Sequence, residues 1–208
     1  MELLAASLVV LIILVANELW WRKRDAHTEL GRKFVHVTVG SFVAFWPLFL
    51  SWEQIELLSI AFLVGITVSK FLNIFQAIHS VQRPTWGEVY FALAVGAIAL
   101  ITHDKWIYVA ALLQMSLADG LAAIVGSRFA GKYRYSVFGH AKSLVGTLTF
   151  FVVSMAILVL VNPHLLTPIS LAWMLGISVA ASFIENVGVN GSDNLLVPVL
   201  VALVLLHV

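Results

Sequence analysis

The 208 residues of the chain are 61% hydrophobic and only 11% charged, with a formal net charge of +1. Soluble domains carry about 25% charged residues, so this composition excludes a soluble globular protein and predicts an integral membrane protein. The chain has no cysteine, which excludes disulfide bonds and thiolate metal sites.

Eight apolar runs predict transmembrane helices, because a helix needs about 20 residues to cross a bilayer. They cover residues 2–20, 35–51, 54–72, 88–102, 105–127, 143–161, 165–186 and 193–208. Each run is apolar on all sides, unlike the alternating strands of a membrane barrel. The fourth and eighth runs are short, so seven helices is the alternative. We expect one all-α domain, 1–208, whose first helix is a retained anchor and not a signal peptide.

The basic residues are distributed unevenly between the two sets of connections. Every Lys and Arg except Lys105 lies in a connection that follows an odd-numbered helix, with Lys70 at the end of the third helix. The positive-inside rule therefore predicts that these connections are cytoplasmic and that both termini lie outside.

Polar residues also enter the start of the second and fourth helices. Arg32, Lys33 and His36 lie close together on the second helix, and we take them as additional candidates for a site. The alternative is that the basic residues reach out to the interface and that His36 only packs. Glu88 begins the fourth helix and is a further candidate, although the helix dipole favours a carboxylate there in any case.

Asp119 stands inside an otherwise apolar run, about eight residues before a basic connection, which places it about 12 Å into the membrane. An ionised Asp at that depth costs several kcal/mol unless it is paired, hydrated or bound to a metal. Ser116, Asp119, Ala123 and Gly126 share one helical face that suits tight packing or a cavity. The alternative to a functional role is a structural hydrogen bond or ion pair with a neighbouring helix.

The connection that follows Asp119 is rich in glycine and positive charge, and it leads into the sixth helix. Glycine lets backbone amides approach phosphate oxygens, a helix N-terminus adds further amides, and Lys or Arg neutralises the remaining charge. The connection does not contain the Walker A pattern. We predict that it binds the phosphates of a nucleotide through Gly126, Arg128, Gly131, Lys132, Lys142, Ser143 and Gly146.

Two further acids lie around the last connection, with asparagine beside each. Glu185 and Asn186 end the seventh helix, and Asp193 and Asn194 begin the eighth. Such oxygen ligands suit Mg²⁺. Helix capping explains Asp193, but the dipole opposes a carboxylate at a helix C-terminus, so a positive group should lie beside Glu185. Together with Asp119, these acids and the basic connection predict phosphate chemistry with Mg²⁺ and a lipid co-substrate.

Four segments resemble, in order and spacing, the polyprenol kinase family, which contains dolichol kinase, phytol kinase and the CTP-dependent diacylglycerol kinase. They are RKFVH at 32–36, LADGLAAIVGSRFAGKY at 117–133, AKSLVGT at 141–147 and ENVGVNGSDNLLVP at 185–198. The segments extend over nearly the whole chain. The part from Asp119 to Gly146 also resembles, more distantly, the phosphatidate cytidylyltransferases.

The resemblance implies transfer of a nucleotide γ-phosphate, usually from CTP, to a lipid alcohol at the cytoplasmic face. It implies that Asp119 and Asp193 are catalytic or metal-binding acids and that Lys142 contacts phosphate. Many members have a glutamate where this chain has Val145. Either that glutamate is dispensable or the metal shell is arranged differently here.

We therefore expect a membrane kinase with CTP and Mg²⁺, acting on phytol, farnesol, dolichol or diacylglycerol. Asp119 and Asp193 would hold Mg²⁺, with Glu185 or Asn194 completing the shell, and either Asp119 or Glu185 would accept the proton of the hydroxyl. We expect membrane lipids but no nucleic acid as partners. The alternatives are a cytidylyltransferase, which would release pyrophosphate, and a non-catalytic transporter or scaffold.

Overall fold

Antiparallel helices make up most of the structure, a computed structural model that describes residues 1–22, 29–72 and 86–208. The helices are α1 (Glu2–Arg22), α2 (Glu29–Ala44), α3 (Trp52–Leu72), α5 (Gly87–Ile101), α6 (Lys105–Leu113), α7 (Asp119–Phe129), α8 (Leu144–Val161), α9 (Leu171–Val187) and α10 (Asp193–His207). Two strands, β1 (Arg134–Val137) and β2 (His140–Ser143), form one hairpin. The expected all-α class is confirmed.

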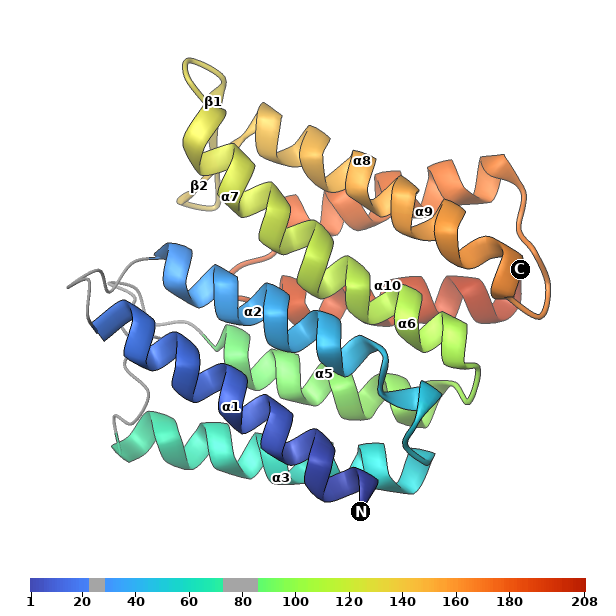
Figure 1. Ribbon diagram of the computed structural model, residues 1–208. Coiled ribbons are helices and arrows are strands. Elements are labelled where there is room, and N and C mark those ends of the chain that lie inside the picture. Colours follow the sequence, from blue (N-terminus) through green and yellow to red (C-terminus); the bar gives the residue numbers. More distant parts are fainter. Residues whose placement is uncertain (23–28, 73–85) are drawn as a thin grey trace.

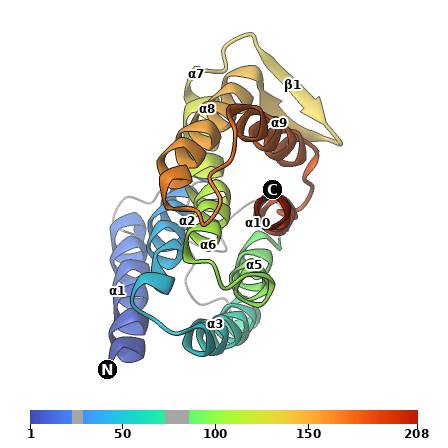
Figure 2. The ribbon, with the colours of Figure 1, turned by 90° about the vertical axis from the view of Figure 1, so that its right-hand side faces the viewer.

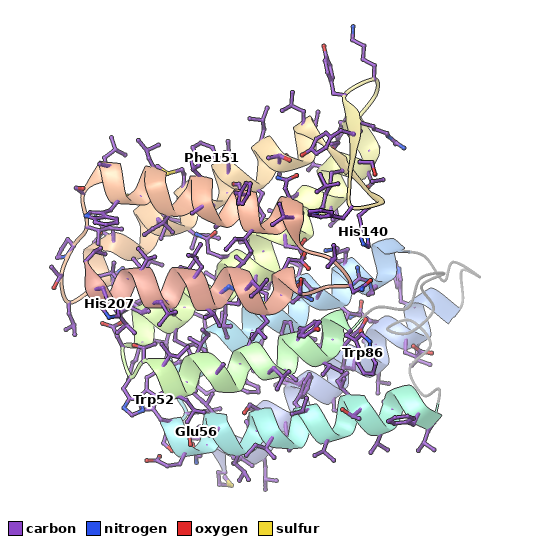
Figure 3. The ribbon with its side chains drawn as sticks, turned by 180° about the vertical axis from the view of Figure 1, so that it is seen from behind. Trp52, Glu56, Trp86, His140, Phe151 and His207 are labelled. Carbon is purple, nitrogen blue, oxygen red and sulfur yellow. The ribbon has the colours of Figure 1, made fainter. Side chains whose placement is uncertain are left out.

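Successive helices run in opposite directions, so functional segments that are far apart in the chain meet at one end of the bundle. Both termini lie at one end, and the hairpin and the α9–α10 connection lie at the other (Figure 1). We call the second end the hairpin end. In Figure 3, Trp86 and His140 mark the hairpin end, whereas Trp52 and His207 lie at the opposite end.

Four of the described helices are long and apolar enough to cross a membrane. They are Glu2–Trp20, Trp52–Ser69, Lys105–Phe129 and Leu144–His164. The third of these is one continuous rod, in which α6 passes through a π-helical segment, Gln114–Ala118, into α7. Counted in this way, the described residues form eight helical rods. The rods α5, α9 and α10 are apolar but shorter.

Two predicted helices differ from the structure, and a proline explains the C-terminal end of one and the N-terminal end of the other. The second helix was expected over 35–51, but α2 covers 29–44 and gives way to a short 3₁₀ turn that contains Pro47. The seventh was expected from residue 165, but α9 begins at Leu171 after Pro168, with the Ser170 hydroxyl capping its first turn. Hydropathy continues through these prolines, whereas the helical hydrogen bonds do not.

The rod formed by α6, the π-helical segment and α7 lies at the centre of the bundle (Figure 2). In its candidate span 67% of the residues are buried, against 22% in the spans of α1 and α3. It packs against α2, α8 and α10. Tyr108 and Leu112 of this rod have no exposed surface, like Phe150 of α8 and Ile98 of α5. Asp119 therefore sits on the helix that is most shielded from lipid.

Glycines allow α7 and α8 to touch backbone to backbone. A Cβ atom on Gly126 would lie 3.0 Å from the Cα atom of Gly146, and a Cβ atom on Gly146 would lie 3.1 Å from the Ala122 carbonyl oxygen. Both glycines are buried. The structure thus gives Gly126 and Gly146 a role in helix packing, where the sequence had suggested room for phosphate.

The basic connection expected to be a loop is in part a β-hairpin, and α7 extends to Phe129 before it. The turn places Phe138 and Gly139 at positive φ angles of 47° and 79°, as a two-residue hairpin turn requires. Strand β2 runs directly into α8, where Ser143 Oγ accepts a hydrogen bond of 3.0 Å from the Gly146 amide. The basic residues Lys23, Arg24 and Arg83 lie outside the described residues.

The contact between α7 and α8 can be tested with two glycine substitutions. Gly126→Ala should destabilise the protein by about 1–3 kcal/mol, because the added methyl group would press on Ser143 Oγ at 2.9 Å and on Gly146. Gly176→Ala is the matched control, since its Cβ atom would meet nothing within 4 Å on α9, and alanine favours a helix. Thermal unfolding in detergent micelles measures both; equal melting temperatures would contradict the packing role of Gly126.

Candidate active site

Three carboxylates from three helices converge at the hairpin end of the bundle. Asp119 begins α7, Glu185 lies in the last turn of α9, and Asp193 begins α10. One carboxylate oxygen of each residue lies within 4.8 Å of the other two. The Asp119 and Glu185 residues are only 5% and 7% exposed. The structure therefore brings together the three acids that the sequence analysis selected from separate segments.

A change in helix geometry precedes Asp119. The Asp119 amide donates to the Gln114 and Ser116 carbonyls and not to the Met115 carbonyl, which would be its partner in an α-helix. The Met115 carbonyl oxygen instead lies 2.9 Å from His36 Nε2. Because a carbonyl can only accept, His36 Nε2 carries the hydrogen. Single π-helical turns of this kind are frequent at functional sites.

Two basic residues of α2 contact the Asp119 carboxylate. Lys33 Nζ lies 2.6 Å from Asp119 Oδ2, and His36 Nε2 lies 3.4 Å from the same oxygen. The close approach of α2 depends on Gly120, since a Cβ atom there would lie 2.0 Å from Val37 Cγ2. Lys33 and His36, which the sequence offered only as additional candidates, are therefore direct neighbours of the central acid.

Lys142 provides the positive group expected beside Glu185. Its Nζ donates to the Glu185 backbone carbonyl at 2.6 Å and to Glu185 Oε1 at 2.5 Å. Burial by itself lowers the pKa of the Lys142 ammonium, but the charge and hydrogen bond of Glu185, together with the charges of Asp193 and Asp119, raise it above its ordinary value. Lys142 therefore remains charged at any physiological pH.

The hairpin is fastened to α8 and α9 through Asn186 and through two residues that sequence reasoning did not select for the site, Tyr135 and Thr147. The Tyr135 hydroxyl contacts the Asn186 side chain and lies 2.6 Å from Thr147 Oγ1. Thr147 Oγ1 lies 3.1 Å from Asn186 Oδ1. Tyr135 pairs with Lys142 across the hairpin, and directly paired residues share one face of a sheet. A prediction of the hairpin would therefore have indicated that Tyr135 lies beside Lys142 at the site.

Asn194 and Glu88 lie beside the three acids but outside their cluster. The Asn194 side chain donates to the Gly87 carbonyl at 2.9 Å and so joins α10 to the start of α5. Glu88 Oε1 is buried and has no hydrogen-bond partner among the described residues. Both side chains line a cavity together with Arg32 and His36. Asn194, whose side-chain oxygen was expected to complete a metal shell, is thus held against α5 through its amide nitrogen.

Arg128, Gly131 and Lys132 are exposed between α7 and the hairpin. The Arg128 guanidinium lies 5.7 Å from the centre of the Phe129 ring, and Lys132 Nζ lies 5.5 Å from the centre of the Tyr133 ring. Within the described part of the chain, no hydrogen bond or ion pair joins Arg128 or Lys132 to the three acids. Of the predicted phosphate-binding residues, Lys142 is the one that contacts an acid of the cluster.

The donor set fits a hard divalent cation. Carboxylate oxygens are the ligands that Mg²⁺ prefers, and the two lysines each occupy one oxygen, Asp119 Oδ2 and Glu185 Oε1. Each of these carboxylates keeps its second oxygen. Three ionised acids and two ammonium groups carry one net negative charge (−3 + 2 = −1), which also favours a cation.

The fold and the site define a helical membrane protein whose carboxylates and lysines meet at one end of the bundle. The chain is 34% identical to the phytol kinase of Synechocystis sp. over 209 residues, which cover 97% of this chain and 88% of the relative. It is 26% identical over 193 residues to an uncharacterized protein of Methanocaldococcus jannaschii, covering 86% and 93% of the two chains. No family model and no solved structure matches. The chain belongs to the polyprenol kinase family.

The ion pair between Lys33 and Asp119 should stabilise the protein even when no divalent ion is added. Lys33→Met should destabilise the protein by about 3–5 kcal/mol, because it leaves a buried carboxylate without its ammonium partner. Adding Asp119→Asn should restore most of that loss, since the unpaired charge is removed. Thermal unfolding of the two single variants and the double variant gives the coupling. Lys105→Met, at an exposed lysine, is the control, and a loss no larger than in this control would contradict the assignment.

Proposed function

We propose that the protein is a kinase that transfers the γ-phosphate of CTP to the hydroxyl group of a lipid alcohol, a prenol such as phytol. The observation that carries the proposal is the convergence of Asp119, Glu185 and Asp193 within 4.8 Å, with two lysines among them. Phosphoryl transfer depends mainly on positioning and on neutralising charge. The similarity to a phytol kinase supports a prenol as the acceptor.

We place the site on the cytoplasmic side of a multi-pass protein. The support is the distribution of charge over the described residues. Lys105 begins α6 at the end opposite to the hairpin, whereas the other lysines and arginines whose side chains are described belong to segment ends at the hairpin end: Arg32, Lys33, Arg128, Lys132, Arg134 and Lys142. Basic residues favour the cytoplasmic side of a membrane. A site at this end is accessible to a water-soluble nucleotide and to a lipid in the same leaflet.

We assign Asp119, Glu185 and Asp193 to Mg²⁺. When bound, the ion would neutralise the charge that develops on the transferred phosphoryl group. The residues of the chain then divide into two sides. Lys33, His36 and Asp119 belong to α2 and α7, and Lys142 and Glu185 belong to β2 and α9.

The side formed by Lys142 and Glu185 is the one we assign to the nucleotide. An ammonium group has three donors, and Lys142 uses two of them on Glu185. The third remains for a phosphate oxygen. The hairpin holds Lys142 in place through Tyr135, Thr147 and Asn186.

The side formed by Asp119 is the one we assign to the lipid alcohol. The hydroxyl oxygen attacks the terminal phosphorus of CTP, a new P–O bond forms, and the bond from that phosphorus to the bridging oxygen breaks to release CDP. The hydroxyl proton passes to the Asp119 carboxylate. Lys33 and His36 hold this carboxylate in one orientation. Glu185 is less suited to the proton transfer, because Lys142 binds both its carbonyl and its carboxylate.

Labelled CTP tests the proposal directly. Purified protein in detergent with Mg²⁺ and phytol should move label from the γ-phosphorus of CTP into the lipid, with release of CDP. Asp119→Asn should lower this rate by about 10²–10³-fold or more, because it removes one preorganised charge from the reacting centre. Asp104→Asn is the matched control, since Asp104 caps α6.

The competing activities have different products in the same assay. Label entering the lipid from the α-phosphorus, with pyrophosphate released, would identify a cytidylyltransferase instead. No transfer to phytol, farnesol, a long polyprenol or diacylglycerol would refute a lipid alcohol kinase. A rate in the Asp119→Asn variant equal to that of the Asp104→Asn control would refute the role of Asp119.

A further inference from the structure

An apolar cavity opens beside the three acids. Its volume is about 460 Å³, counted with its open side. Helices α1, α2, α3 and α5 supply its apolar walls. None of these four helices carries one of the three acids. The apolar lining residues are Leu14, Val35, Val39, Phe62, Ile66 and Phe91.

One end of the cavity is polar and adjoins the carboxylate site. Arg32, His36, Glu88 and Asn194 line this end. His36 connects the cavity to the site directly, because its Nε2 lies 3.4 Å from Asp119 Oδ2. Asn194 follows Asp193 in the chain and is held against α5 by its bond to the Gly87 carbonyl. The cavity therefore adjoins the acid cluster, with His36 between the two.

Glu88 is an unexplained polar group at this end. Its Oε1 atom is buried, and no described residue donates a hydrogen bond to it. A buried polar atom without a partner costs about 1–3 kcal/mol, so such atoms usually meet a ligand or water. A hydroxyl group at the polar end of the cavity would supply the missing donor when the alcohol binds, before its proton passes to Asp119 in the transfer step.

We propose that this cavity binds the hydrocarbon chain of the acceptor alcohol as a single prenyl chain, with its hydroxyl group at the polar end between Glu88 and His36. The proposal rests on the proposed function and specifies its substrate class. The walls carry no polar side chain away from the Glu88 end, so a chain without polar groups matches them.

The cavity selects among alcohols by the shape of their hydrocarbon chains, and not by removing those chains from water. A prenol already lies in lipid, which is as apolar as leucine side chains, so entry into the cavity gains little hydrophobic free energy. What the cavity contributes is the position of the hydroxyl relative to Asp119 and a limit on the chain that fits. Its effects should therefore appear in the discrimination between prenols of different length.

A pair of substitutions on α3 tests this selection. Ile66 is 9% exposed and lines the cavity, whereas Val64 is 57% exposed on the same helix. Ile66→Phe should lower kcat/KM for phytol by about tenfold or more relative to a short prenol such as geraniol, since filling part of an apolar pocket changes discrimination by that amount. Val64→Phe should leave the ratio unchanged. The KM for CTP should be the same in both variants and in the unaltered protein.

Each outcome of this comparison has one meaning. If Ile66→Phe lowers phytol and geraniol turnover equally, or behaves like Val64→Phe, the cavity does not hold the chain. If the unaltered protein prefers diacylglycerol to every prenol, a single-chain occupant is excluded. If the unaltered protein phosphorylates no lipid alcohol, the proposed function itself has failed.

A binding measurement keeps the proposal testable if Ile66→Phe does not fold. A prenol analogue with a photoreactive diazirine at the end of its chain should label peptides of α2, α3 or α5 in the unaltered protein. Excess phytol should suppress that labelling. Labelling spread evenly over lipid-facing helices such as α8, without competition by phytol, would overturn the proposal.

Discussion

Three carboxylates within 4.8 Å of one another repel each other, and the site depends on how the bundle offsets that repulsion. Burying an unpaired charge costs several kcal/mol, so each buried acid needs a partner. Asp119 is paired with Lys33 on α2, and Glu185 is paired with Lys142 on β2. The first pairing depends on the close approach of α2 to α7 at Gly120, and α8, which follows β2 directly, approaches α7 closely at Gly126 and Gly146. The close helix contacts and the ion pairs are therefore parts of one arrangement, in which the hairpin places Lys142 beside Glu185.

The two ion pairs give the site two different sides. Lys33 and His36 bring Asp119 next to an apolar cavity whose polar end carries Glu88. Lys142 belongs to the hairpin and pairs with Glu185, so this side of the site adjoins the exposed basic residues around the hairpin. Under the proposed function, a lipid alcohol would reach the acids from the first side and a nucleotide from the second. Helices that alternate in direction make this possible, because every segment involved ends or begins at the hairpin end (Figure 1).

Sequence reasoning predicted the all-α class and selected the three acids, because charged residues inside apolar helices are costly and therefore conspicuous. It did not predict the hairpin, since the turn uses Phe138 and Gly139 where Asn-Gly or Asp-Gly would have been the usual sign. Nor did it assign Lys33 to Asp119 or Lys142 to Glu185. Twelve basic residues were available, and the choice among them depends on how the helices pack in space. Gly126 and Gly146 have a packing role that the sequence did not reveal, because glycine serves close approach of helices and of ligands alike, and their contact with phosphate stays a prediction.

The central claim is that Asp119, Glu185 and Asp193 together bind a divalent cation. Electron paramagnetic resonance with Mn²⁺ as a substitute for Mg²⁺ tests it most directly, since bound and free Mn²⁺ give distinct signals. The unaltered protein and the Asp104→Asn control should bind Mn²⁺ with the same affinity, and Asp119→Asn, Glu185→Gln and Asp193→Asn should each bind at least about tenfold more weakly. Equal Mn²⁺ affinity in all five proteins, or no bound Mn²⁺ in the unaltered protein, would contradict the account.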